Sequence, residues 1–210
     1  MAVMAVTVAL GGAATARAQA PAELAAPDAA AGAAADTGAR TQPEREQPER
    51  GQQERLARLY DELAVAPERQ AARIAREIAL EWSRSGSPAM DLLLRRGNDA
   101  LEAGDTAAAI AHFSALTDHA PDFAEGWYRL ALAHALAGLD GPAIDDLRRA
   151  LALQPRHFDA IAGLGALAER TGKTALARRA YEAVLAIHPH HREAREGLER
   201  LRAESGGKDI

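Results

Sequence analysis

The sequence predicts an all-α fold, and three observations lead to this prediction. The chain has 210 residues, of which 48% are hydrophobic but only 4% aromatic, so its core must be built mainly from the helix formers Ala and Leu. Apolar residues recur at helical spacing from about residue 53 onward. Pro121, Pro155 and Pro189 lie 34 residues apart, which indicates three consecutive copies of one helical unit.

Residues 1–18 look like a secretory signal peptide. Residues 2–14 are small and apolar except for Thr7, and small residues alternate through Ala16, Ala18 and Ala20. Cleavage after Ala18 is preferred, with position 20 as the alternative end, because a proline follows Ala20. The run is shorter than the roughly 20 apolar residues that span a membrane, so we expect no membrane insertion of the mature chain.

This reading predicts a bacterial exported protein in the periplasm. The alternative is a cytoplasmic protein with an Ala-rich start, which stays open because no Lys or Arg precedes the apolar run. Residues 19–51 follow and contain almost no bulky apolar side chain. Such a segment cannot bury enough surface to offset its ordering entropy, so we predict a disordered linker there.

Residues 52–84 are predicted to form a helical hairpin. Leu56, Leu59 and Leu63 share one face of the first helix, and the second helix extends from Pro67 to Trp82 with apolar residues at four-residue steps. We expect this hairpin to cover the free end of the first repeat. At the other end, residues 192–205 form a polar helix with three apolar residues on one face, as a capping helix should.

The three repeats are predicted at 90–123, 124–157 and 158–191, because four more classes of position keep the 34-residue period. These classes are turn glycines, closely packed alanines, large side chains that fill the space between helices, and small residues where two helix backbones approach each other. Their members are Gly104, Gly138 and Gly172; Ala109, Ala143 and Ala177; Phe113, Leu147 and Tyr181; and Gly97, Ala131 and Gly165.

At these positions the chain resembles the tetratricopeptide repeat (TPR) family, whose 34-residue unit is a helix, a short turn, a second helix and a terminal proline. The resemblance covers about residues 90–189. It departs from the family pattern where an aromatic residue is replaced by Ala100, His134 and Ala168. The resemblance implies a right-handed superhelical stack of helical hairpins, in which three TPR-like repeats stand between an N-terminal hairpin and a C-terminal capping helix.

The resemblance also implies that another protein binds, as a peptide or a helix, in a concave groove lined by the first helices of the repeats. Only Asn98 matches the family's carboxylate-binding clamp, so we expect no such clamp. In the 34-residue register the groove comprises Leu94, Arg95, Asn98, Leu101, Tyr128, Arg129, Leu132, Ala135, Ala162 and Ala166.

The predicted function is therefore that of a non-catalytic protein–protein interaction adapter or scaffold without a cofactor. The chain shows no nucleophile elbow, no Gly-rich phosphate loop and no metalloprotease pattern. Its net charge of −5 argues against a nucleic-acid partner, which would need a basic face. The absence of Cys excludes disulfides and thiolate chemistry.

Two alternatives remain open. The exposed apolar wall of a repeat stack could drive self-association, which would make the protein a structural component. The less favoured alternative is a metal-binding protein that uses the tract of His188, His190 and His191. No acidic or His residue at i, i+4 spacing completes a tetrahedral set, so these three are weak candidates and no metal site is assigned.

Overall fold

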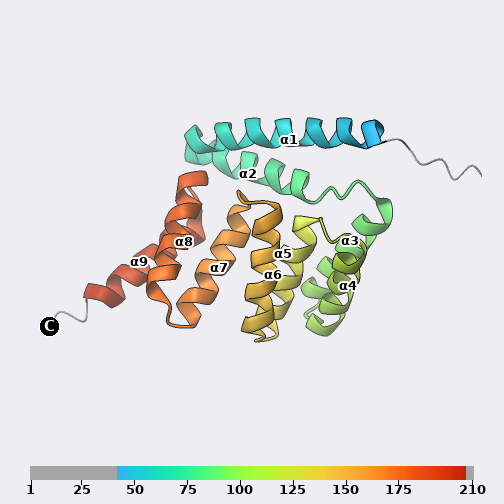
Figure 1. The fold of residues 1–210 in the computed structure, drawn as a ribbon. Helices are drawn as coiled ribbons and strands as arrows, with labels where there is room; N and C mark the ends of the chain where they lie inside the picture. Colours follow the sequence, from blue (N-terminus) through green and yellow to red (C-terminus); the bar gives the residue numbers. More distant parts are fainter. Residues whose placement is uncertain (1–41, 207–210) are drawn as a thin grey trace, which may run out of the picture. The chain divides into compact units, whose positions relative to one another are not determined.

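The computed structural model describes residues 42–206, with side chains described from residue 50 to residue 204. The predicted signal peptide and most of the predicted linker lie outside this part of the chain. The described residues form nine helices and no strand, which confirms the all-α prediction (Figure 1). The helices are α1 (Gln42–Val65), α2 (Glu68–Trp82), α3 (Pro88–Glu102), α4 (Thr106–His119), α5 (Ala124–Leu136), α6 (Asp140–Leu153), α7 (Phe158–Arg170), α8 (Thr174–Ile187) and α9 (Arg192–Gly206).

Helix α1 begins inside the segment predicted as a disordered linker, so that prediction is wrong for residues 42–51. The sequence QPEREQPERG lacks bulky apolar residues, and this composition is typical of a disordered linker. Glu, Gln and Arg are nevertheless good helix formers, and these residues extend a helix that is already anchored at its other end by Leu56 and Leu63.

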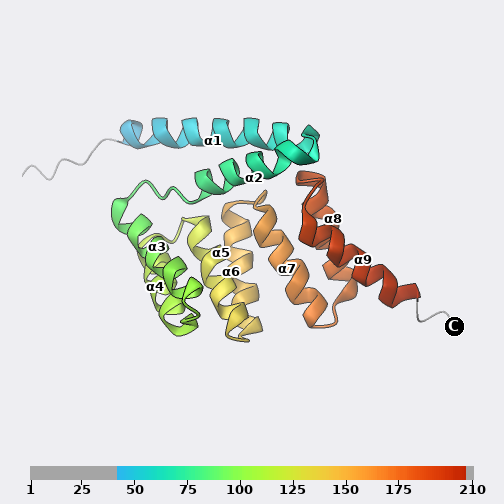
Figure 2. The same cartoon turned by 180° about the vertical axis from the view of Figure 1, so that it is seen from behind.

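The six helices α3 to α8 pair into three hairpins that pack side by side, and α9 packs on the last one (Figures 1 and 2). The turns inside the hairpins are alike because Gly104, Gly138 and Gly172 each end a first helix with positive φ angles of 76°, 74° and 71°. A left-handed residue at this position closes the helix end without a Cβ clash. The 34-residue spacing of the glycines therefore reflects one repeated backbone conformation.

Bulky residues of the second helices fill the space that small residues of the first helices leave. An added Cβ at Gly97 would overlap the ring of Phe113, and one at Gly165 would lie 2.8 Å from Cε1 of Tyr181. Tyr181 is also covered by Gly197 of α9, so its ring is enclosed between two helix backbones. These contacts are the close packing that the periodic small and large residues predicted.

The hairpin of α1 and α2 does not cover the first repeat, which corrects our expectation. Both views show it lying across the ends of the repeat helices, and its core joins that of the third repeat (Figures 1 and 2). The indole of Trp82 stacks on the imidazole of His157 with ring centroids 3.8 Å apart, and it lies 4.7 Å from the ring of Phe158. Trp82 also donates a hydrogen bond of 3.1 Å from Nε1 to the hydroxyl of Tyr60.

The free face of the first repeat needs no cover, because its residues are mostly polar. On α3 this face carries Leu92, Arg96 and Asp99, and all three are exposed. The positions 34 and 68 residues later pack against the preceding hairpin, and the residues there are apolar. The corresponding residues are Gly126, Leu130 and Ala133 on α5, and Ala160, Leu164 and Leu167 on α7.

Candidate protein-interaction surface

All ten residues predicted for the groove lie on the first helices α3, α5 and α7. Helix α3 contacts α5, and α5 contacts α7, so these helices form one continuous wall. The exposure of the ten side chains differs along this wall. Arg95 and Ala166 are exposed, Leu94 and Ala162 are buried, and Asn98, Leu101, Tyr128, Arg129, Leu132 and Ala135 are half-buried.

Leu94 and Ala162 do not offer free surface, although the register assigned them to the groove. Only 4% of Leu94 and 3% of Ala162 is exposed, and each belongs to a core cluster. Leu94 packs in the cluster around Phe113, where it stabilises the first repeat. Helical periodicity cannot separate core from groove at such positions, because both lie on the inner side of the helix.

Asn98 has a polar atom that the fold leaves unused. Its Oδ1 atom is buried and accepts no hydrogen bond from the described residues. A buried acceptor without a partner costs free energy, so an additional N–H donor beside Asn98 would be favourable.

Arg129 is committed to an internal network. Its Nε donates a 2.6 Å hydrogen bond to Oε1 of Glu125, whose Oε2 lies 3.0 Å from Nε2 of the fully buried His157. The other ring nitrogen of His157, Nδ1, accepts a hydrogen bond from the backbone N–H of Ala160 and caps α7. Nε2 therefore carries the ring N–H and donates a hydrogen bond to Oε2 of Glu125.

Tyr128 lies over this network, and its ring centroid is 4.7 Å from that of His157. Burial, and next the carboxylate of Asp159, raise the pKa of Tyr128, so the phenol stays neutral. The guanidinium of Arg129 lies 5.4 Å from the same ring. Because these side chains hold one another, the α5 part of the wall is preorganised.

The network recurs one repeat later. His191 lies 3.3 Å from Asp159 and accepts a hydrogen bond from the backbone N–H of Ala194 at the start of α9. Sequence reasoning missed both acid–histidine pairs. The sequence did carry a sign that these residues are equivalent in neighbouring repeats, because Glu125 and Asp159 are 34 residues apart, as are His157 and His191.

The histidine tract has structural contacts that compete with metal binding. Both ring nitrogens of His191 are engaged, and Nδ1 of His190 lies 2.9 Å from Nη2 of Arg195. His188 is buried against Phe158, and its Nδ1 lacks a partner among the described residues. In the described part of the chain, no three or more His, Cys, Asp or Glu residues are grouped so that they could hold a metal ion.

Between residues 42 and 206 no helix combines the length and the apolar character that crossing a bilayer requires.

Comparison with known proteins identifies the repeats. The family model described as Tetratricopeptide repeat matches residues 94–157 and 142–192. A TPR repeat-containing protein of Rhizobium etli is 33% identical over 138 residues, which make up 66% of this chain and 68% of the relative.

Solved structures share the fold. The first TPR of Spaghetti (RPAP3) bound to HSP90 peptide SRMEEVD superposes with a TM-score of 0.54 at 24% identity, covering 56% of this chain and 93% of that chain. The MamA protein superposes with a TM-score of 0.52 at 22% identity, covering 74% of this chain and 82% of that chain. Both the repeat positions and the hairpin stack thus match, and the chain belongs to the tetratricopeptide repeat family.

Proposed function

We propose that this chain is an exported, non-catalytic adapter that holds a peptide or helix of another protein on the wall formed by α3, α5 and α7. One observation carries the proposal. The wall is continuous, and Leu101, Tyr128 and Leu132 on it are half-buried rather than fully covered by the fold. Partly exposed apolar side chains on rigid, adjacent helices are suited to anchoring a peptide.

Proteins with this fold support the kind of partner proposed. RPAP3 is described as bound to an HSP90 peptide, and the TPR2B domain of yeast Sti1 as a complex with pHsp70. Their identities of 24% and 20% establish only the fold, so the sequence that this wall would select is not inherited from them. The unpaired Oδ1 of Asn98 favours a partner that presents an N–H donor.

Leu132→Glu tests the groove. The partner is first isolated by affinity capture from an envelope extract with the full chain. Its affinity for the wild type and for the Leu132→Glu variant is then measured. A charge desolvated in the bound interface should lower affinity at least about tenfold, while stability should change by no more than ~0.5 kcal/mol.

Leu176→Glu is the matched control, because Leu176 is 37% exposed but lies on the second helix α8. It should leave affinity unchanged. Equal binding by Leu132→Glu would place recognition on another surface, and unfolding of that variant would place Leu132 in the core. Sedimentation addresses self-association, since a stable dimer that buries Tyr128 and Leu132 would leave no free groove.

Export is proposed from the N-terminal sequence alone. N-terminal sequencing of the protein from its own cells should begin at Gln19 or Pro21. Recovery of intact Met1 from the cytoplasm would contradict it.

A further inference from the structure

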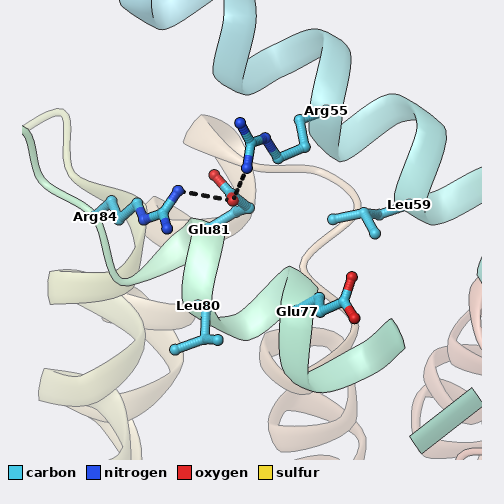
Figure 3. Close-up of a pocket in the computed structure, with 6 residues that line it drawn as sticks. All are labelled: Arg55, Leu59, Glu77, Leu80, Glu81 and Arg84. Carbon is cyan, nitrogen blue, oxygen red and sulfur yellow. Dashed lines mark hydrogen bonds and ion pairs between the residues drawn. The ribbon is translucent and has the colours of Figure 1, made fainter. Parts of the chain in front are cut away.

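A second surface with binding chemistry lies on the N-terminal hairpin, outside the repeats. A cleft of about 440 Å³ opens between α1 and the end of α2 (Figure 3). It is lined by Arg55, Leu59, Glu77, Leu80, Glu81 and Arg84.

A buried carboxylate positions the two arginines of this cleft. Glu81 is only 5% exposed, and its Oε1 accepts hydrogen bonds from Nη1 of Arg84 at 2.8 Å and from Nη1 of Arg55 at 3.4 Å. Figure 3 shows the two guanidinium groups approaching one carboxylate oxygen of Glu81 from different directions. Since a buried charge must be paired, Glu81 holds both arginines at the rim of the cleft.

The arginines keep binding capacity beyond Glu81. The side chains of Arg55 and Arg84 are 57% and 61% exposed, and the hydrogen bond of each to Glu81 uses only Nη1. A guanidinium carries further N–H donors in a planar fork that fits a carboxylate. The second acid of the cleft, Glu77, is already paired with Arg73. Both carboxylates of the cleft are therefore already engaged, whereas Arg55 and Arg84 still have N–H donors that a ligand could use.

The cleft also has an apolar part. Leu80 is 61% exposed although it lies on the same helix as the buried Ile78 and Trp82. Leu59, which is almost completely buried, forms the adjacent wall. An exposed leucine beside two positioned guanidinium groups matches a ligand that carries an acid next to an apolar side chain.

We propose that this cleft binds an acidic peptide segment of another protein, in which Asp or Glu lies next to a large apolar residue. The carboxylate of the peptide pairs with Arg55 and Arg84, and its apolar neighbour packs on Leu80. The hairpin thereby gives the protein a second interaction site that does not depend on the repeat groove.

The probe is the terminally blocked peptide Ala-Leu-Glu-Glu-Leu-Ala, with Ala-Leu-Gln-Gln-Leu-Ala as its uncharged counterpart. Binding to the isotope-labelled full chain is followed by NMR. We expect the acidic peptide to shift the Nε–H signals of Arg55 and Arg84 and the methyl signals of Leu80. The uncharged peptide should bind at least about tenfold more weakly, since it lacks the charge-assisted hydrogen bonds.

Leu80→Ala removes the apolar contact from an exposed position and should weaken binding several-fold without affecting the fold. Arg55→Lys combined with Arg84→Lys keeps positive charge beside Glu81 but removes both forks, and it should also weaken binding. Arg58→Gln is the control, because Arg58 is exposed on α1 and does not line the cleft.

Three results would overturn the proposal. These are no shift with the acidic peptide, equal affinity for the two peptides, or binding that survives both Leu80→Ala and the double lysine variant. Leu132→Glu in the repeat groove should leave the peptide affinity unchanged, so failure of the groove proposal and failure of this one are distinguishable.

Discussion

At the scale of single residues, two glycines of α7 differ in whether the structure has room for a side chain at their position. A Cβ at Gly165 would lie 2.8 Å from Cε1 of Tyr181, whereas one at Gly163 would lie 3.6 Å from Cδ2 of Leu147. The first distance requires Tyr181 to move, and the second is an ordinary contact. Tyr181 cannot move easily, because α9 encloses its ring and its hydroxyl donates a 2.7 Å hydrogen bond to Glu169.

Gly165→Ala should therefore destabilise the protein by about 1–3 kcal/mol through overpacking. Gly163→Ala is the matched control in the same helix and should stabilise by ~0.5–1 kcal/mol, because alanine favours the helix. Chemical denaturation of both variants provides the measurement. Equal effects of the two substitutions would mean that the small residue at 165 serves no packing role.

His188 should make stability depend on pH. Burial, and next the neighbouring His191, lower the pKa of His188 from 6.5 to about 4. Because the folded pKa is below the unfolded one, the stabilising contribution is complete above pH 6.5 and is lost as the pH falls toward about 4. His188→Gln should therefore lose less stability than the wild type between about pH 7 and about pH 5.

Urea midpoints at the two pH values provide this measurement. His119→Gln removes an exposed histidine of α4 and should keep the wild-type pH dependence. If His188→Gln keeps it as well, another group is responsible for the acid sensitivity.

At the scale of elements, Trp82 contributes to joining the N-terminal hairpin to the third repeat, beside the apolar contacts of the shared core. Trp82 stacks on His157, contacts Phe158 and binds Tyr60, so it joins the hairpin to the turn between α6 and α7. Trp82→Ala should cost about 3–5 kcal/mol of hairpin stability. We expect limited proteolysis to cut within α1 and α2 of this variant while the repeats stay resistant.

Val65→Ala is the control, since Val65 is 83% exposed in the same hairpin and should change stability by no more than ~0.5 kcal/mol. A Trp82→Ala hairpin as resistant as the wild type would show that other contacts suffice to hold it.

At the scale of the whole described chain, stability should rise from the first repeat to the third. The α3–α4 pair has a neighbouring hairpin on one side only, whereas α7–α8 packs between α5–α6 and α9 and also contacts α1. Repeat stability grows with such interfaces. Native-state hydrogen exchange should show α4 amides opening at a free energy lower than that of α8 amides by ~1 kcal/mol or more. Equal opening energies would indicate one cooperative unit.

The register predicted which helices carry the proposed groove residues, but it did not predict how exposed these residues are. The 34-residue register placed Leu94 and Leu132 alike on the inner side of first helices, yet Leu94 is 4% exposed and Leu132 is half-buried. Whether an inner residue is covered depends on the side chains of the neighbouring hairpin, which lie far away in the sequence.

The sequence by itself determined the repeats, because the conformations of proline and glycine are local properties of the backbone. The period of Gly104, Gly138 and Gly172 therefore predicted hairpin turns that the structure confirms. Only the tertiary structure decided where the hairpin of α1 and α2 docks and which acid meets which histidine. Trp82 reaches His157 and Glu125 reaches His157 across long stretches of chain, and such pairs follow from the assembled surfaces of several helices rather than from any local pattern.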